Sequence, residues 1–240
     1  TGYYHWMAET LPRILTIKDY LKKAILLFPE EWKASGFQLE SLKPFNLNKV
    51  QFLPKNSIVK IQRLLMPTHT AASGYVDDDL IKELRSLYQK YYSKKCSFNF
   101  GERIYISRSK AKKRKIVNED QVIIVVQKYG FKVIYFEDHS LEQTVQICKN
   151  AKCMISLHGA GLTNVMFMNK GGYVLEFIKS FKENPKIVPT IFNLSQALNI
   201  NYMYQICEPE NDFHDINKAD LKVDISFLKR NVEFMLGKIK

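Results

Sequence analysis

Short apolar segments and helix-like segments alternate along the second half of the chain. Five segments have the length and composition of buried strands: Arg103–Ser107, Lys132–Phe136, Cys153–Leu157, Tyr173–Ile178 and Tyr202–Ile206. The stretches between them show helical spacing of apolar residues: Glu119–Tyr129, Leu141–Asn150, Leu162–Met168 and Val188–Leu198. This alternation predicts a parallel sheet of the Rossmann type, whose ligands bind at the carboxyl ends of the strands. The residues that follow strands are therefore the first candidates for function.

The first half of the chain is less regular. Residues 1–28 have mostly helical spacing, with a kink or break at Pro12. Val50–Leu53 and Ile58–Ile61 are short strand candidates, and Asp77–Tyr92 is predicted to be an amphipathic helix. We expect an α/β protein with three parts: an N-terminal domain at 1–96, a Rossmann-like domain at 97–220 and a terminal helix at 221–240.

Composition and charge are those of a globular protein with an anionic partner. Hydrophobic residues make up 46% of the 240 residues, and no apolar run reaches the roughly 18 residues of a membrane helix. The first residue is Thr1, so we expect a trimmed fragment whose upstream elements, including any anchor, are missing. The net charge of +12 favours nucleotide phosphates, a membrane surface or nucleic acid as partner.

The cysteines are expected to be reduced core residues. They have no CxxC spacing, which argues against a zinc site and against a disulfide framework. The four positions are Cys96, Cys148, Cys153 and Cys207.

The first candidate site is a glycine-containing turn after the third predicted strand. It consists of His158, Gly159, Ala160, Gly161, Leu162, Thr163 and Asn164. Glycines let the backbone approach a ligand closely, and the free N–H groups at a helix start attract an anion. His158 and Thr163 add side-chain donors. The spacing is not GxGxxG, so a dinucleotide site does not fit, and a tight turn that merely requires glycine is the alternative.

The second candidate site is a basic segment after the first predicted strand. Ser107 ends the strand and Arg108 follows it, and a basic run continues from Lys110 to Lys115 and includes Arg114. The planar guanidinium of Arg108 could clamp a diphosphate. A solvated basic loop is the alternative. Aromatic residues do not interleave the run, so stacking on nucleic acid is not supported.

The third candidate site is the pair of His5 and Glu9. If the N-terminal segment is helical, these residues lie one turn apart on one face. An imidazole beside a carboxylate is suited to act as a general base near neutral pH. The alternatives are a capping or core histidine and a metal site, for which two ligands are weak support.

Two acidic features each allow two interpretations. Asp77, Asp78 and Asp79 precede a predicted helix, where acidic residues cap the helix and complement its dipole. An Asp-x-Asp metal site is the less favoured interpretation. Glu176 lies within an apolar strand and needs a partner. That partner is either a ribose hydroxyl of a ligand or a structural hydrogen bond.

Together these segments resemble glycosyltransferase family 61. The segments that carry the resemblance are Arg103–Arg108, Arg114–Glu119, Tyr135–Asp138, His158–Asn164 and Val174–Glu176. His5 and Glu9 also resemble the family's His-x-x-x-Asp/Glu element. The family includes plant xylan-decorating xylosyl- and arabinosyltransferases, animal protein O-linked N-acetylglucosaminyltransferases and many bacterial polysaccharide enzymes. The resemblance covers nearly the whole chain, most firmly Thr1–Leu11 and Arg103–Ile178.

The resemblance implies two Rossmann-like domains that face each other across a cleft, the GT-B arrangement. It implies an inverting transferase that needs no metal or other cofactor and uses a nucleotide-sugar donor, with UDP favoured. We expect a diphosphate site at Ser107, Arg108, Arg114 and the turn 158–164, with Glu176 on the ribose. His5 would deprotonate the acceptor hydroxyl with Glu9 orienting it, or the reverse. The first domain is short for this pattern and could lack its opening strands. The basic cluster after Arg108 is also denser than the motif needs.

Other functions stay open at this stage. They are a non-catalytic nucleotide-sugar-binding protein, an NAD-dependent oxidoreductase, which the missing GxGxxG disfavours, and a basic nucleic-acid-binding module. We expect a sugar donor and a glycan or glycoconjugate acceptor as partners, and no nucleic acid. The Lys-, Asn- and Ile-rich composition suggests an AT-rich, bacterial genome. On that basis we expect a cytoplasmic protein, with peripheral membrane association left open. A eukaryotic homologue would instead lie in the Golgi or endoplasmic reticulum lumen.

Overall fold

The computed structural model contains a sheet of six strands built from the second half of the chain. It describes residues 2–34, 36–93, 100–179, 189–210 and 219–239. The strands are β3 (Arg103–Ile106), β4 (Lys132–Ile134), β5 (Cys153–Leu157), β6 (Tyr173–Lys179), β7 (Asn201–Pro209) and β8 (Leu221–Lys222). Their spatial order is β4-β3-β5-β6-β7-β8. All neighbours are parallel except β7 and β8. The predicted parallel sheet is confirmed.

The strand order reverses at β3. From β3 the chain first adds β4 on one side and then returns to add β5 on the other, with Ile106 of β3 beside Ser156 of β5. In open parallel sheets, ligands bind outside the carboxyl ends of the strands at such a reversal. The residues that follow β3 and β5 therefore share the favoured position.

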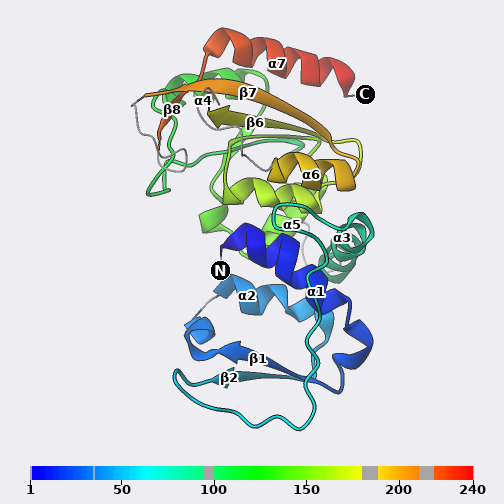
Figure 1. The fold of residues 1–240 in the computed structure, drawn as a ribbon. Helices are drawn as coiled ribbons and strands as arrows, with labels where there is room; N and C mark the ends of the chain where they lie inside the picture. The colour runs from blue at the N-terminus through cyan, green and yellow to red at the C-terminus, as the bar shows by residue number, and fades with distance from the viewer. Residues whose placement is uncertain (1, 35, 94–99, 180–188, 211–218, 240) are drawn as a thin grey trace.

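Helices cover both faces of the sheet, as parallel strands require. One face carries α4 (Glu119–Lys128) and α7 (Ile225–Lys238), which share an apolar core with β5 and β6. The other face carries α5 (Leu141–Asn150), η6 (Ala160–Phe167) and α6 (Thr190–Ala197). The two layers are visible above and below the sheet in Figure 1.

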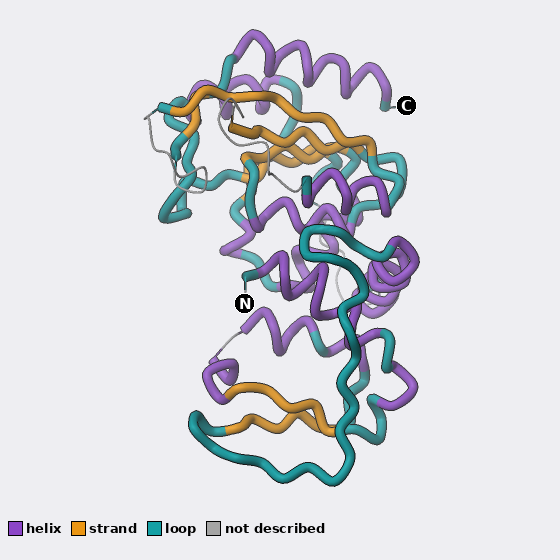
Figure 2. The backbone as a smooth tube through the Cα atoms, viewed as in Figure 1, coloured by secondary structure: helices purple, strands orange, loops and turns teal. Residues whose placement is uncertain are grey.

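The first half of the chain adds a helical layer and a small parallel sheet. Its helices are η1 (His5–Thr10), α1 (Leu11–Leu15), η2 (Lys18–Tyr20), η3 (Glu30–Ala34), α2 (Gly36–Ser41), η4 (Lys43–Phe45) and α3 (Asp78–Tyr92). In the second half of the chain, one more short helix, η5 (Phe136–Asp138), follows β4. Strands β1 (Ile25–Pro29) and β2 (Lys49–Leu53) pair in parallel. This pair lies at the end of the molecule opposite to α7 (Figure 2).

One apolar core joins the two halves of the chain. It contains Trp6 of η1, Tyr88 of α3 and Phe167 of η6, all fully buried. The rings of Tyr88 and Phe167 lie 5.3 Å apart between centroids. The N-terminal helices therefore pack directly on the helices that cover the sheet. The predicted boundary at 96/97 lies outside the described residues and stays a prediction.

Three predicted elements were wrong. The segment 1–28 is helical at first but ends in β1, because a short apolar run fits a strand or a helix equally well. Ile58–Ile61 forms no strand, and Ile58 is fully exposed. The terminal helix begins at Ile225 rather than at residue 221. Leu221 and Lys222 pair with β7 instead, and the side chain of Asp224 caps the helix.

Two expectations about the whole chain can be compared with the structure. Cys148, Cys153 and Cys207 are buried free thiols, as predicted, whereas Cys96 lies outside the described residues. Among the helices that the structure describes, none is long and apolar enough to cross a membrane.

The capping interpretation of the acidic run can be tested on stability. Asp77 Oδ1 accepts hydrogen bonds from the backbone N of Asp79 (3.1 Å) and of Leu80 (3.0 Å) at the start of α3. We expect Asp77→Ala to lower the free energy of unfolding by about 1 kcal/mol and Asp77→Asn to change it little. Urea denaturation measures this. Asp79→Ala, which alters a side chain that is 99% exposed, is the control. Equal losses for both alanine variants would contradict the cap.

Candidate functional site

Arg108 lies at the reversal of strand order, directly after β3. Its side chain is partly buried and is held by backbone carbonyls of the following turn. Nε donates to the Arg114 carbonyl (3.2 Å) and Nη2 donates to the Lys113 carbonyl (3.3 Å). Arg114 itself has a left-handed backbone, with φ of 57°. The turn therefore fixes the direction of the Arg108 guanidinium without neutralising its charge.

The electrostatics of Arg108 favour an anion. Burial lowers the pKa of Arg108, the nearby charge of Arg114 lowers it further, and Glu137 opposes both. Within the part of the chain that the structure describes, Arg108 forms no ion pair at contact distance. A partly desolvated cation beside a second cation gains free energy when an anion binds between or over them.

Gly159 lies against the guanidinium of Arg108. A Cβ atom on Gly159 would come closer to Arg108 Nη1 than real Cβ atoms come to any neighbour. This contact gives the glycine a specific reason beyond turn geometry, because any side chain at 159 would displace the arginine. The two motifs that the sequence analysis treated separately thus form one site at the ends of β3 and β5.

Behind the glycine turn, His158 is held by a buried carboxylate. His158 Nδ1 lies 2.6 Å from Glu176 Oε1, and the Tyr202 hydroxyl donates to Glu176 Oε2 at 2.6 Å. Glu176 is 3% exposed. Burial raises the pKa of Tyr202, and the Glu176 charge raises it further. Glu176 therefore has two protein partners, the structural alternative left open by the sequence.

This geometry orients the His158 ring. With Nδ1 bonded to a carboxylate, we assign the ring proton to Nδ1, which leaves Nε2 on the opposite side of the imidazole. The His158 side chain is 39% exposed, so Nε2 can meet a ligand.

The remaining turn residues differ in solvent exposure. Ala160 is exposed and Gly161 partly exposed, whereas Leu162, Thr163 and Asn164 are buried. The Thr163 hydroxyl is buried and has no hydrogen-bond partner within the described residues, so it does not extend to the surface as expected. Ser107 is likewise buried (1% exposed), and its hydroxyl bonds to Ser109 within its own turn.

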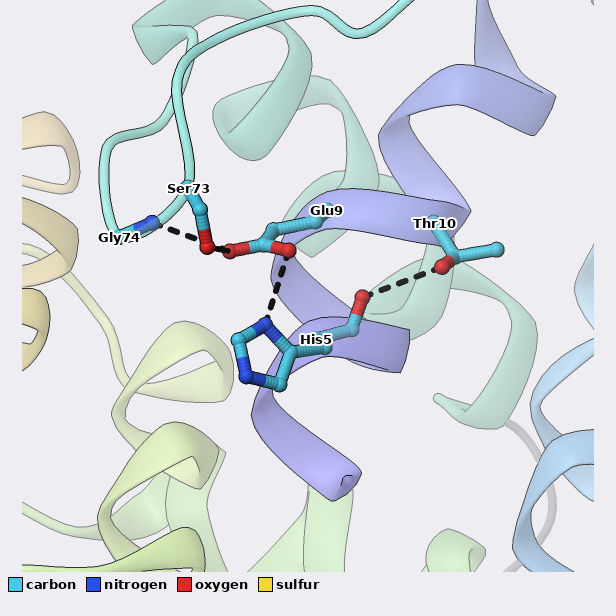
Figure 3. A network of polar contacts seen from close by, with 5 residues as sticks. All are labelled: His5, Glu9, Thr10, Ser73 and Gly74. Carbon is cyan, nitrogen blue, oxygen red and sulfur yellow. Dashed lines mark hydrogen bonds and ion pairs between the residues drawn. The ribbon is translucent and has the colours of Figure 1, made fainter. Parts of the chain in front are cut away.

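His5 and Glu9 form the expected pair on one face of a helix. His5 Nδ1 lies 2.9 Å from Glu9 Oε2 (Figure 3). The helical stretch is a π-helix, η1, a rare form that is frequent at functional sites. Thr10 donates to the His5 carbonyl at 3.1 Å within it. The His5 side chain is 56% exposed and that of Glu9 17%.

The environment of Glu9 keeps it ionised. Burial opposes its ionisation, but hydrogen bonds from His5, Gly74 and Ser73 together outweigh burial and lower the pKa of Glu9. Ser73 Oγ and Gly74 N donate to Glu9 Oε1 at 2.9 and 3.0 Å. With Nδ1 on the carboxylate, the exposed His5 Nε2 is the atom free to accept a proton.

One hydrogen bond links the two candidate regions. The Tyr3 hydroxyl donates to Asn164 Oδ1 at 2.6 Å. Tyr3 lies two residues before His5, and Asn164 ends the glycine motif. Asn164 Oδ1 therefore contacts the N-terminal helix, which ties the segment of the His5–Glu9 pair to the turn, and its expected contact with a ligand stays a prediction.

Several residues of the site escaped the sequence analysis. Four residues from distant segments donate hydrogen bonds to site residues: Tyr3, Ser73, Gly74 and Tyr202. No spacing rule in the sequence connects these donors to their partners. Only the position of Tyr202 could have been suspected, once β7 is known to lie beside β6. Within the described residues no group of three or more His, Cys, Asp or Glu could hold a metal.

Comparison with known proteins decides the family. The model of the family described as glycosyltransferase 61 matches residues 3–175. The chain belongs to this family. The match includes His5, Glu9, Arg108 and the whole glycine turn, and it confirms the resemblance noted in the sequence.

Named relatives of the family-61 chain come from animals and plants. Protein O-linked-mannose β-1,4-N-acetylglucosaminyltransferase 2 of Bos taurus is 25% identical over 235 residues, 85% of this chain and 40% of the relative. Its Homo sapiens counterpart is 30% identical over 197 residues, 70% and 33% respectively. Xylan glycosyltransferase MUCI21 of Arabidopsis thaliana is 24% identical over 206 residues, 73% and 42%. The chain thus spans less than half the length of each of these relatives.

The buried hydrogen bond to Glu176 can be tested in this family-61 chain. We expect Tyr202→Phe to lower the free energy of unfolding by about 1–3 kcal/mol, because a buried carboxylate loses a donor. Tyr204→Phe is the matched control, since Tyr204 is 56% exposed on the same strand. Urea denaturation at neutral pH compares the two. A loss no larger than that of the control would show that the Tyr202 hydroxyl contributes little.

Proposed function

We propose that this chain carries the donor site and the base of an inverting glycosyltransferase. It moves a sugar from a nucleotide-sugar donor, UDP-linked, to a hydroxyl of a glycan or glycoconjugate. The observation that carries the proposal is the oriented, partly buried Arg108 guanidinium against Gly159 at the reversal of strand order. Family membership and the names of the relatives support the reaction class.

The donor's diphosphate binds at the ends of β3 and β5 in this proposal. Arg108 and Arg114 offset its charge, and the backbone N–H groups of the exposed Ala160 and the partly exposed Gly161 donate to it. His158 Nε2, oriented by Glu176 at Nδ1, donates to the diphosphate when the ring carries both protons. These groups stabilise the charge that develops on the leaving diphosphate, which is the part a metal ion plays in other transferases.

The transfer step uses the His5–Glu9 pair. His5 Nε2 takes the proton of the acceptor hydroxyl while the hydroxyl oxygen forms a bond to the anomeric carbon of the donor sugar. The bond from that carbon to the diphosphate oxygen breaks, and the diphosphate leaves with the electron pair. Glu9 holds the Nδ1 proton and stabilises the imidazolium that forms. Attack from the face opposite to the leaving group inverts the anomeric centre.

The proposed architecture is a GT-B arrangement in which the six-stranded sheet supplies the donor side and the N-terminal helix supplies the acceptor side. The βαβ unit of β1, α2 and β2 fits part of a second Rossmann-like domain, because its two strands are parallel. The Tyr3–Asn164 bond supports a short path between the base and the donor site.

The first test is nucleotide binding. We expect UDP to bind with excess EDTA present, measured by calorimetry. Arg108→Ala should weaken it about 10- to 100-fold, because a charge-assisted contact is worth roughly 1.5–3 kcal/mol. Lys112→Ala removes an exposed charge of the same basic turn and should change affinity little. Equal losses would indicate general electrostatics, and loss of binding in EDTA would contradict metal independence.

The second test examines the role of His5 and Glu9 in the transfer step. We expect His5→Ala and Glu9→Gln to reduce release of UDP from UDP-sugars, with water or added glycan as acceptor, by about 10²–10⁴-fold. UDP affinity and melting temperature should stay near wild type. Wild-type turnover should fall at acid pH, because a protonated imidazole cannot accept the proton. Full turnover in both variants would remove the pair from the mechanism.

One other function remains as an outcome of these tests. UDP binding without any turnover of UDP-sugars would identify a non-catalytic nucleotide-sugar-binding protein. In that case the His5–Glu9 pair would be structural, and His5→Ala would lower stability and donor affinity together.

A further inference from the structure

A long irregular segment, 54–77, connects β2 to α3. It has no helix or strand of its own. It runs from the small sheet past α1 toward α6 (Figures 1 and 2). Arg13 of α1 donates to its Pro67 carbonyl, with Nη2 at 2.6 Å. Connections of this length without regular structure are uncommon in compact proteins and are usually either functional loops or linkers.

The end of this segment makes two contacts with Glu9. The Ser73 hydroxyl and the Gly74 amide both donate to Oε1, at 2.9 and 3.0 Å (Figure 3). The other oxygen, Oε2, is left to His5. Donors on both oxygens fix the plane of the carboxylate, and with it the direction in which His5 is held.

The same peptide also contacts the second half of the chain. Asn193 Nδ2 of α6 donates to the Gly74 carbonyl at 3.0 Å. Gly74 is buried and has φ of 84°, a backbone conformation that favours glycine. Gly74 therefore lies between Glu9 on the N-terminal helix and α6 on the large sheet.

We propose that Ser73 and Gly74, held in place by Asn193, are positioning residues for the His5–Glu9 pair. This inference rests on the proposed function and extends it, because the base is then assembled from three separate segments. The segment supplies neutral donors that keep Glu9 ionised and turned toward His5. A misplaced base costs rate even when every reacting group is present.

The sign of the electrostatic effect follows from the groups around Glu9. Within the described residues, His5 and Tyr4 are the titratable groups that interact with it, and both lie on the same helix. Burial, with a contribution from Glu9, raises the pKa of Tyr4 to about 12, so Tyr4 stays neutral. Ser73 and Gly74 stabilise the ionised carboxylate, and loss of either donor must raise the pKa of Glu9.

The first arm of the experiment needs no activity. The Glu9 carboxyl carbon is followed by NMR over pH in the full chain, with Glu9→Gln assigning its signal. We expect Ser73→Ala to raise the midpoint by about 0.5–1 pH unit, and Asn193→Ala to move it in the same direction. Ser57→Ala removes a hydroxyl of the same segment that donates to the Pro54 carbonyl, and it should leave the midpoint unchanged. An unmoved midpoint in Ser73→Ala would overturn the inference.

The second arm measures turnover of the same proteins. We expect Ser73→Ala to lower release of UDP from UDP-sugars about tenfold, with UDP affinity unchanged. In the Glu9→Gln background Ser73→Ala should have no further effect, because its action passes through Glu9. If Ser73→Ala turns over the donor at the wild-type rate, the inference is overturned and the proposed function is not. A wild type that turns over no donor would overturn the proposed function, and the inference with it.

Discussion

The apolar core that joins the N-terminal helix to one face of the sheet is the constraint on which both candidate sites depend. Trp6 is fully buried at its centre, and its indole nitrogen donates to Ser41 Oγ at 2.7 Å. Its ring contacts Phe28 and Trp32 at 5.7 and 5.2 Å between centroids. Close-packed interiors permit few alternative arrangements, so the core restricts where the helix that carries His5 and Glu9 can lie. The Tyr3–Asn164 bond then specifies its rotation.

Much of the sheet, and several residues of the candidate site, could be predicted from the sequence. Segments such as Cys153–Leu157 are short and mostly apolar, and they alternate with longer helical segments, which favoured buried strands. Arg108 and His158 were marked because each follows a strand. Their meeting depends on the order β4-β3-β5, which periodicity does not encode. Glu176 was recognised as a buried acid that needs a partner, and it has two.

What the sequence lacked was long-range pairing. Glu9 is 65 residues from Gly74, and Gly74 is 119 from Asn193, so no local pattern links them. Strand β1 was missed because Ile25–Pro29 follows a segment with helical spacing, and a short apolar run fits a strand or a helix equally well. Thr163 was assigned to the ligand from its place in the motif. The tight turns of η6 bury it instead, which residue type alone could not reveal.

The two edges of the large sheet have a consequence for solubility. The outermost strands, β4 and β8, contain three and two residues. A long open edge offers unpaired N–H and C=O groups to another chain and can seed aggregation. Here β8 also runs antiparallel to its neighbour and leads directly into α7. The border beside β8 is nevertheless longer than β8 itself, because β8 pairs only with Glu208 and Pro209 of β7. Among the described strands, residues 201–207 of β7 pair with β6 alone. That stretch is therefore the part of the sheet where pairing with another chain would begin.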